Sequence, residues 1–142
     1  MITRHRLTEE SDFSGGVPEM RIGSAERALG VRFPPAFRAF LIELGSGGAG
    51  SEEFIGLGGP SHLDVVQATL WARQSPRGFP PTLIPLRRDG FGNYDCLDLD
   101  CETESSCPVV EWVHEAPNGQ RRVLAPDYEA WFASILEMAA ED

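Results

Sequence analysis

The sequence predicts a single α+β domain, with a central, mainly antiparallel sheet flanked by N-terminal and C-terminal helices. Apolar residues recur at helical spacing near both ends of the chain, whereas residues 83–124 contain short strand-like runs separated by turn residues. Helices and strands do not alternate one by one, as they would in a parallel α/β sheet. With 142 residues, the chain is long enough to bury one core.

The first third of the chain is expected to be helical. Residues 1–19 are rich in Gly, Ser and Glu and read as an arm or leading loop, ahead of a domain over residues 20–142. A short helix follows, with Ser24 as its N-cap and Gly30 at its end. A second helix begins at Pro35. Its apolar residues share one face: Phe37, Phe40, Leu41 and Leu44.

Residues 45–51 are expected to form a glycine-rich loop, and residues 53–57 a short strand. The loop satisfies the pattern G-x-G-x-x-G, but it follows a helix and precedes a strand. A dinucleotide-binding turn needs the opposite order, so we interpret the segment as a plain loop. Ser61 is then expected to cap a third helix. The residues expected to face inward on that helix are Leu63, Val66 and Leu70.

Strands are expected at residues 83–86, 94–99 and 108–113, and Asn118–Gly119 predicts a tight hairpin into a fourth strand at 121–124. Pro85 indicates an edge position or a bulge. Pro126 is expected to open the last helix in its first turn. The inward-facing residues of that helix are Tyr128, Trp131, Phe132, Ile135, Leu136 and Ala139. Trp112, Trp131 and Phe132 are interpreted as core residues.

The formal net charge is −10, every basic side chain is an arginine, and residues 89–120 contain no arginine. That stretch carries eight acidic residues and therefore −8 of the −10: Asp89, Asp95, Asp98, Asp100, Glu102, Glu104, Glu111 and Glu115. Such a field repels nucleic acid and anionic lipid, and it speeds encounter with a basic partner. The alternative is that the acids only keep the protein soluble.

The three cysteines, Cys96, Cys101 and Cys107, are an odd number in one short segment. This count argues against a disulfide framework and for a reducing compartment. Together with His114 they are separated by four, five and six residues, and only the first of these spacings falls within the C-x₂₋₄-C range of zinc sites, so no full ligand pattern is present. The alternating carboxylates of residues 98–104 lack the glycine of a calcium loop. No metal or cofactor is therefore expected.

Catalytic patterns are also missing from the sequence. It contains three histidines, His5, His62 and His114, and no G-x-S-x-G turn, so we expect no enzyme. A deep pocket lined by His62 or His114 would favour an enzyme or a ligand-binding protein instead. No apolar run approaches the roughly 20 residues that span a membrane, and no secretory signal precedes the domain. We therefore expect a cytoplasmic protein.

Four stretches, in their order and spacing, resemble the SUKH superfamily, the Smi/Knr-like domains of fungal cell-wall regulators and many bacterial immunity proteins. The resemblance covers about residues 20–138. The stretches are AERALGVRFP (25–34) with FRAFL (37–41), LIPL (83–86) with DGFGNYDCLDL (89–99), CPVVEWVHE (107–115), and LA (124–125) with YEAWF (128–132).

The resemblance implies an α+β domain with no enzymatic activity and, in bacteria, an antidote to a toxin domain that is often a nuclease. Gly90, Gly92 and Asn93 match the family's Gly-x-Gly-Asn turn, and Asp98 matches the aspartate after it. We interpret these four residues as shaping a hairpin, because Gly and Asn tolerate positive φ.

Charge and resemblance together predict a protein partner, a basic toxin domain, and neither nucleic acid nor membrane. Acidic side chains would occupy the toxin's basic cleft in place of phosphates. The residues expected to bind are Asp89, Asp95, Asp100, Glu102, Glu104, Glu111 and Glu115. The alternative is a regulatory or scaffold domain that binds a cellular partner.

Overall fold

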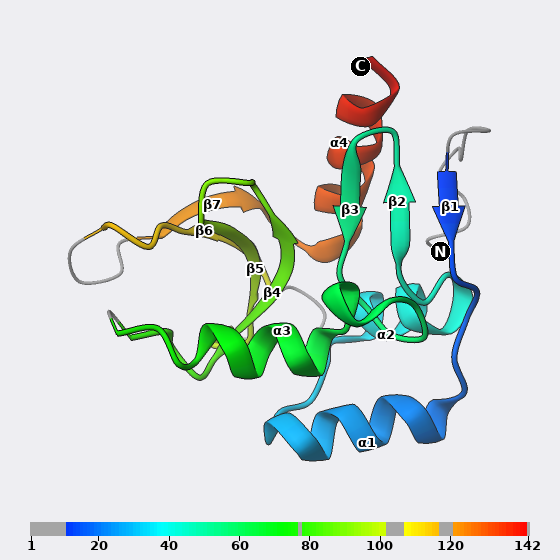
Figure 1. Cartoon of the computed structure of the whole chain (residues 1–142), viewed down its shortest axis with the longest axis horizontal. Helices are drawn as coiled ribbons and strands as arrows, with labels where there is room; N and C mark the ends of the chain where they lie inside the picture. The colour runs from blue at the N-terminus through cyan, green and yellow to red at the C-terminus, as the bar shows by residue number, and fades with distance from the viewer. Residues whose placement is uncertain (1–10, 77, 102–106, 117–120, 142) are drawn as a thin grey trace.

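The computed structural model describes residues 11–76, 78–101, 107–116 and 121–141, and there it shows helices flanking two antiparallel sheets (Figure 1). The predicted α+β class is confirmed, with the antiparallel strands divided between the two sheets. The helices are α1 (Glu19–Leu29), α2 (Pro35–Glu43), the 3₁₀ turn η2 (Ser61–Leu63), α3 (Val65–Ala72) and α4 (Tyr128–Glu141). Within the described residues, no helix is both long and apolar enough to cross a membrane.

The smaller sheet has the order β1-β2-β3, with β1 (Ser11–Phe13), β2 (Gly47–Ala49) and β3 (Glu52–Phe54). The larger sheet has the order β4-β5-β6-β7, with β4 (Leu83–Arg88), β5 (Tyr94–Asp98), β6 (Val109–Trp112) and β7 (Arg121–Ala125). The backbone N–H of Ile55, just after β3, donates to Leu86 O at 2.9 Å and connects the two sheets. β4 is an edge strand of its sheet with a register shift after Pro85, as that proline predicts.

The main core lies where α2, α4 and the smaller sheet meet (Figure 1). Its centre is aromatic and fully buried: Phe37, Phe40, Phe54, Tyr128 and Phe132. Burial raises the pKa of the Tyr128 phenol well above its usual value. A second, smaller cluster contains Phe79, Cys96 and Trp112. Since Cys96 and Leu97 alternate along β5, one strand contributes to both cores.

The predicted N-terminal arm is wrong for the part of it that the structure describes. Residues 11–13 form β1, and the Phe13 ring packs against Phe40 and Phe54 with ring centroids 6.2 and 5.9 Å apart. The predicted loop at 45–51 contains β2. Gly47 has φ +153°, and a Cβ there would lie 2.2 Å from Asp12 O, so glycine permits this strand pairing.

Three helix starts also differ from the prediction. α1 begins at Glu19 after Pro18, and Ser24 lies inside it. Ser61 opens only the 3₁₀ turn, and α3 is capped by Asp64, whose Oδ1 accepts from Gln67 N at 3.0 Å. The buried residues of α3 are Val65, Ala68, Thr69 and Ala72, so Leu70, which was expected to face inward, is instead 42% exposed. Before α4, Asp127 Oδ1 accepts from Ala130 N at 2.8 Å, so Pro126 precedes that helix.

The expectation of no disulfide is wrong. Cys101 and Cys107 are bonded, with their Cα atoms 5.2 Å apart, and only Cys96 is a free thiol. The antiparallel pairing of β5 with β6 continues in the bond from Asp98 N to Pro108 O at 2.9 Å. The pairing of the two strands therefore brings Cys101 and Cys107 close together, and an odd number of cysteines in the sequence does not reveal this proximity.

Candidate functional site

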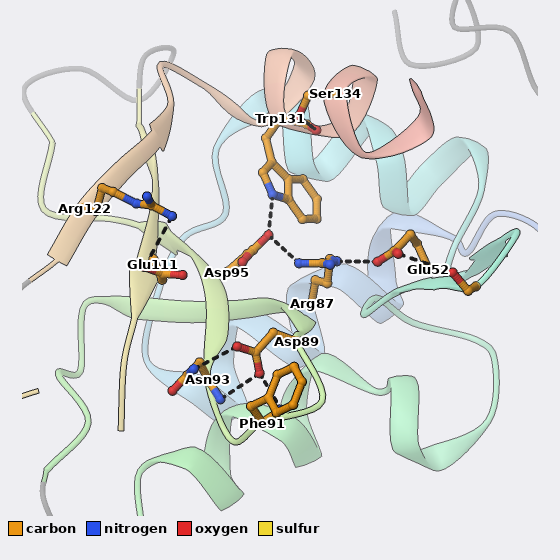
Figure 2. Close-up of polar contacts among 11 residues, drawn as sticks. Glu52, Arg87, Asp89, Phe91, Asn93, Asp95, Glu111, Arg122, Trp131 and Ser134 are labelled. Carbon is orange, nitrogen blue, oxygen red and sulfur yellow. Dashed lines mark hydrogen bonds and ion pairs between the residues drawn. The ribbon is translucent and has the colours of Figure 1, made fainter. Parts of the chain in front are cut away.

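Asp95, predicted to bind a partner, is instead a buried structural residue. Its Oδ2 accepts from Trp131 Nε1 at 2.9 Å and from Arg87 Nη1 at 3.1 Å, and Arg87 Nε donates to Glu52 Oε1 at 2.7 Å (Figure 2). Burial would lower the pKa of Arg87, but the two carboxylates outweigh it and raise that pKa. Asp95 is only 6% exposed, so the prediction that it binds a partner is wrong.

The arginine-free stretch of sequence does not form an arginine-free surface. Register pairs Asp95 on β5 with Arg87 on β4, and Glu111 on β6 with Arg122 on β7. Arg122 Nη2 lies 3.6 Å from Glu111 Oε1 (Figure 2). Arginines from both flanking strands therefore offset acids of the two inner strands.

The remaining predicted acids are distributed unevenly. Asp100 is exposed, and Glu115 is exposed with its Oε1 3.6 Å from His114 Nε2. Glu102 and Glu104 lie outside the described residues. Asp98 is at the far end of β5 from the β4–β5 turn, where its Oδ1 accepts from Asp100 N at 3.0 Å.

The β4–β5 turn is held by one carboxylate. Asp89 accepts from Phe91 N at 2.7 Å, from Asn93 N at 3.1 Å and from Asn93 Nδ2 at 2.8 Å (Figure 2). Burial alone would raise the pKa of Asp89, but these hydrogen bonds lower it. Gly90 and Gly92 have φ values of +88° and +93°, which favour glycine. Asp89 therefore shapes the turn.

The turn also positions His114. Asn93 Nδ2 is used by Asp89, so Asn93 Oδ1 faces His114 and accepts from its backbone N at 3.1 Å. His114 Nδ1 lies 2.8 Å from the same oxygen and donates to it, because a carbonyl oxygen only accepts. A Cβ at Gly92 would lie 3.0 Å from the His114 ring, so glycine lets the ring approach.

Beside the turn is an open hollow of about 400 Å³. The end of α3, the turn and strands β5 and β6 line it: Trp71, Ala72, Gln74, Ser75, Pro76, Gly92, Tyr94, Trp112 and His114. Trp112 is buried and its ring packs against Tyr94 and Phe79, with ring centroids 5.8 and 5.1 Å apart. Trp71 at the rim is 70% exposed, and Phe91, next to Gly92, is 80% exposed.

Sequence reasoning missed Trp71 and Phe91. Each carried a local signal, because Trp71 lies off the apolar stripe of its helix and Phe91 stands between two turn glycines. Of the two histidines named in the sequence analysis as candidates for lining a pocket, His114 lines this hollow. His62 does not line it, and its Nε2 lies 3.1 Å from Glu53 Oε2. Among the described residues, no group of three His, Cys, Asp or Glu side chains is placed to hold a metal.

Comparison with known proteins agrees with this fold. A crystal structure of a protein from Pseudomonas syringae pv. tomato is similar, with a TM-score of 0.66 and 20% sequence identity. The match covers 99% of this chain and 97% of that one, and at this identity it shows the fold alone. A family model described as "SMI1-KNR4 cell-wall" (SUKH_5) matches residues 5–137, including residues 5–19 of the segment predicted to be an arm. The chain therefore belongs to the SMI1-KNR4 cell-wall family.

Proposed function

We propose that this protein acts by binding another protein, as an immunity protein that neutralises a basic bacterial toxin domain, without catalysis. The observation that carries the proposal is the exposed Trp71 side chain that lines an open hollow, together with the exposed Phe91 in the turn whose Gly92 lines the same hollow. A large apolar side chain exposed at a concavity is typical of protein interfaces, where Trp contributes strongly to affinity.

The lining of the hollow supports a binding role over a catalytic one, because the described residues that line it include no aspartate, glutamate, cysteine or lysine beside His114. The Asp89 carboxylate and the Asn93 amide hold the turn, and His114 Nδ1 is used by Asn93. A histidine that acts as a general base needs an unprotonated nitrogen near the substrate, and its other nitrogen oriented by a partner. Asn93 orients His114 in this way, but no acid or thiol is among the described residues that line the hollow with it, and its Nε2 lies 3.6 Å from the exposed Glu115 carboxylate.

Exposed acids support a basic partner. The net charge of −10 favours encounter with a cationic protein, and Asp100 and Glu115 are exposed on the predicted acidic segment. Interactions of such rim charges change association rates more than dissociation rates.

A binding experiment tests this proposal. The tagged protein is expressed in its source organism, and any stoichiometric partner is identified, produced and titrated in vitro. We expect a toxin domain with a basic surface, whose activity is lost in the complex. Housekeeping proteins as the only specific partners would favour the regulatory alternative, and a complex that leaves toxin activity intact would contradict an immunity function.

Charge variants then test the role of the acids. Asp100→Asn with Glu115→Gln should slow association several-fold at low salt and change it little at high salt, because salt screens exposed charges. Glu141→Gln, an exposed carboxylate at the end of α4, is the matched control. Equal rates for both variants at low salt would exclude Asp100 and Glu115 from the interface.

A further inference from the structure

We propose that the hollow beside the β4–β5 turn receives an arginine side chain of the partner, with the guanidinium held against the aromatic rings of Trp71, Tyr94 and Trp112. This inference rests on the proposed function and specifies the chemistry of its binding site. Three features of the hollow support it: three aromatic side chains, the absence of cationic groups among the described residues that line it, and a built-in arrangement of its walls.

The three aromatic side chains that line the hollow come from three separate elements. Trp71 ends α3, Tyr94 begins β5 and Trp112 ends β6. The ring centroids of Tyr94 and Trp112 are 5.8 Å apart, at an interplanar angle of 36°. A guanidinium is attracted to the face of an aromatic ring when it lies within about 6 Å of the ring centroid, and its planar shape lets it stack on that face.

The charge of the site suits a cation. Neither arginine nor lysine is among the described residues that line the hollow, although the chain has 12 basic residues. Arg121 faces Trp112 in register but does not line the hollow. The exposed Glu115 carboxylate lies beside His114 at its edge, where it attracts a cation from solution.

The walls are held in place before any partner binds. Phe79 packs edge-on against both Tyr94 and Trp112, with centroids 5.9 and 5.1 Å away. At the β4–β5 turn, the Asp89–Asn93 hydrogen bonds fix His114 through Asn93. Because these groups are already ordered, binding loses little conformational entropy at them. Trp71 is the exception, since it is 70% exposed.

A titration with small probes tests the chemistry directly. Nα-acetylarginine amide is compared with Nα-acetylcitrulline amide, a neutral isostere, while NMR follows the three tryptophan indole N–H signals of the labelled full chain. We expect arginine to shift the Trp71 and Trp112 signals saturably and to bind about tenfold more tightly than citrulline. Trp131 is the internal control, because its buried Nε1 donates to Asp95. Equal binding of both probes, no saturable shift, or an equal shift of Trp131 would overturn the inference.

Variants connect the hollow to the partner. Trp71→Leu should weaken the arginine probe and the toxin complex by about tenfold each, and it should fold because Trp71 is largely exposed. Leu70→Ala, the adjacent residue that does not line the hollow, is the matched control and should change neither. A toxin complex unaffected by Trp71→Leu would overturn the inference and leave the proposed function standing. Arginine binding without any toxin partner would overturn the proposed function alone.

Discussion

Removing the charge of Asp95 should destabilise the protein far more than removing a neighbouring acid. Asp95→Asn leaves the Arg87 guanidinium, whose side chain is 15% exposed, paired only with Glu52. Breaking a buried ion pair costs about 3–5 kcal/mol. Since Glu52 still contacts Arg87 at 2.7 Å, we expect the lower end, about 3 kcal/mol in the free energy of unfolding.

The matched control is Glu111→Gln. Glu111 faces Asp95 in the β5–β6 register, but its partner Arg122 is 72% exposed, so this ion pair contributes less than about 1 kcal/mol. Asp95→Ala should cost more than Asp95→Asn, because it also leaves the Trp131 N–H without its acceptor, at about 1–3 kcal/mol.

Urea unfolding followed by tryptophan fluorescence measures these differences. The three variants and the wild type are compared at one pH and salt concentration, with the m-value checked for constancy. A loss of about 3 kcal/mol would lower the melting temperature by roughly 10 °C. Asp95→Asn within 1 kcal/mol of Glu111→Gln would refute the conclusion that Asp95 is a structural residue.

Three further predictions concern the turn, the disulfide and one glycine. Because the pKa of Asp89 is lowered in the folded protein, its carboxylate contributes stability that is present above the unfolded-state pKa and is lost as the pH falls through the folded-state pKa. The urea midpoints of the wild type and Asp89→Asn should therefore converge as the pH falls below about 4. If their difference is independent of pH, the carboxylate does not hold the turn. The Cys101–Cys107 disulfide joins residues six positions apart, and the small loop that it closes predicts that reduction lowers the free energy of unfolding by about 2 kcal/mol. Equal urea midpoints with and without reductant would contradict this prediction. Gly45→Ala should lower the free energy of unfolding by at least about 2 kcal/mol more than Gly30→Ala does. Both glycines have positive φ, but only at Gly45 would a Cβ meet a backbone oxygen, at 2.2 Å. Equal losses of stability in urea unfolding would refute the predicted clash.

The elements of the fold were largely predictable, because the signals that define them are local. The apolar stripe of α2, the alternation along β5 and the edge position of Pro85 all follow from sequence spacing. Errors came where a long-range contact outweighed a local signal. Residues 11–13 are polar enough to read as a loop, yet they pair with β2.

The candidate site was less predictable than the fold. The turn residues Gly90, Gly92 and Asn93 were found through the resemblance, and their φ values and hydrogen bonds suit a turn. Trp71 was not found although it lies off the apolar stripe of α3, because its place beside a hollow depends on residues of β5 and β6 that are distant in the sequence. The disulfide was missed because cysteine pairing depends on strand neighbours.

By itself, the sequence determined the α+β class, most of the strands and the acidic composition, because periodicity and charge can be read along a chain. Only the tertiary structure decided where each charge lies. Register placed Arg87 against Asp95 and Arg122 against Glu111, and so converted part of an acidic stretch into internal ion pairs. The same folding brought three distant aromatic residues to one hollow. Burial and proximity depend on neighbours across the sheet, which adjacent residues in the sequence do not specify.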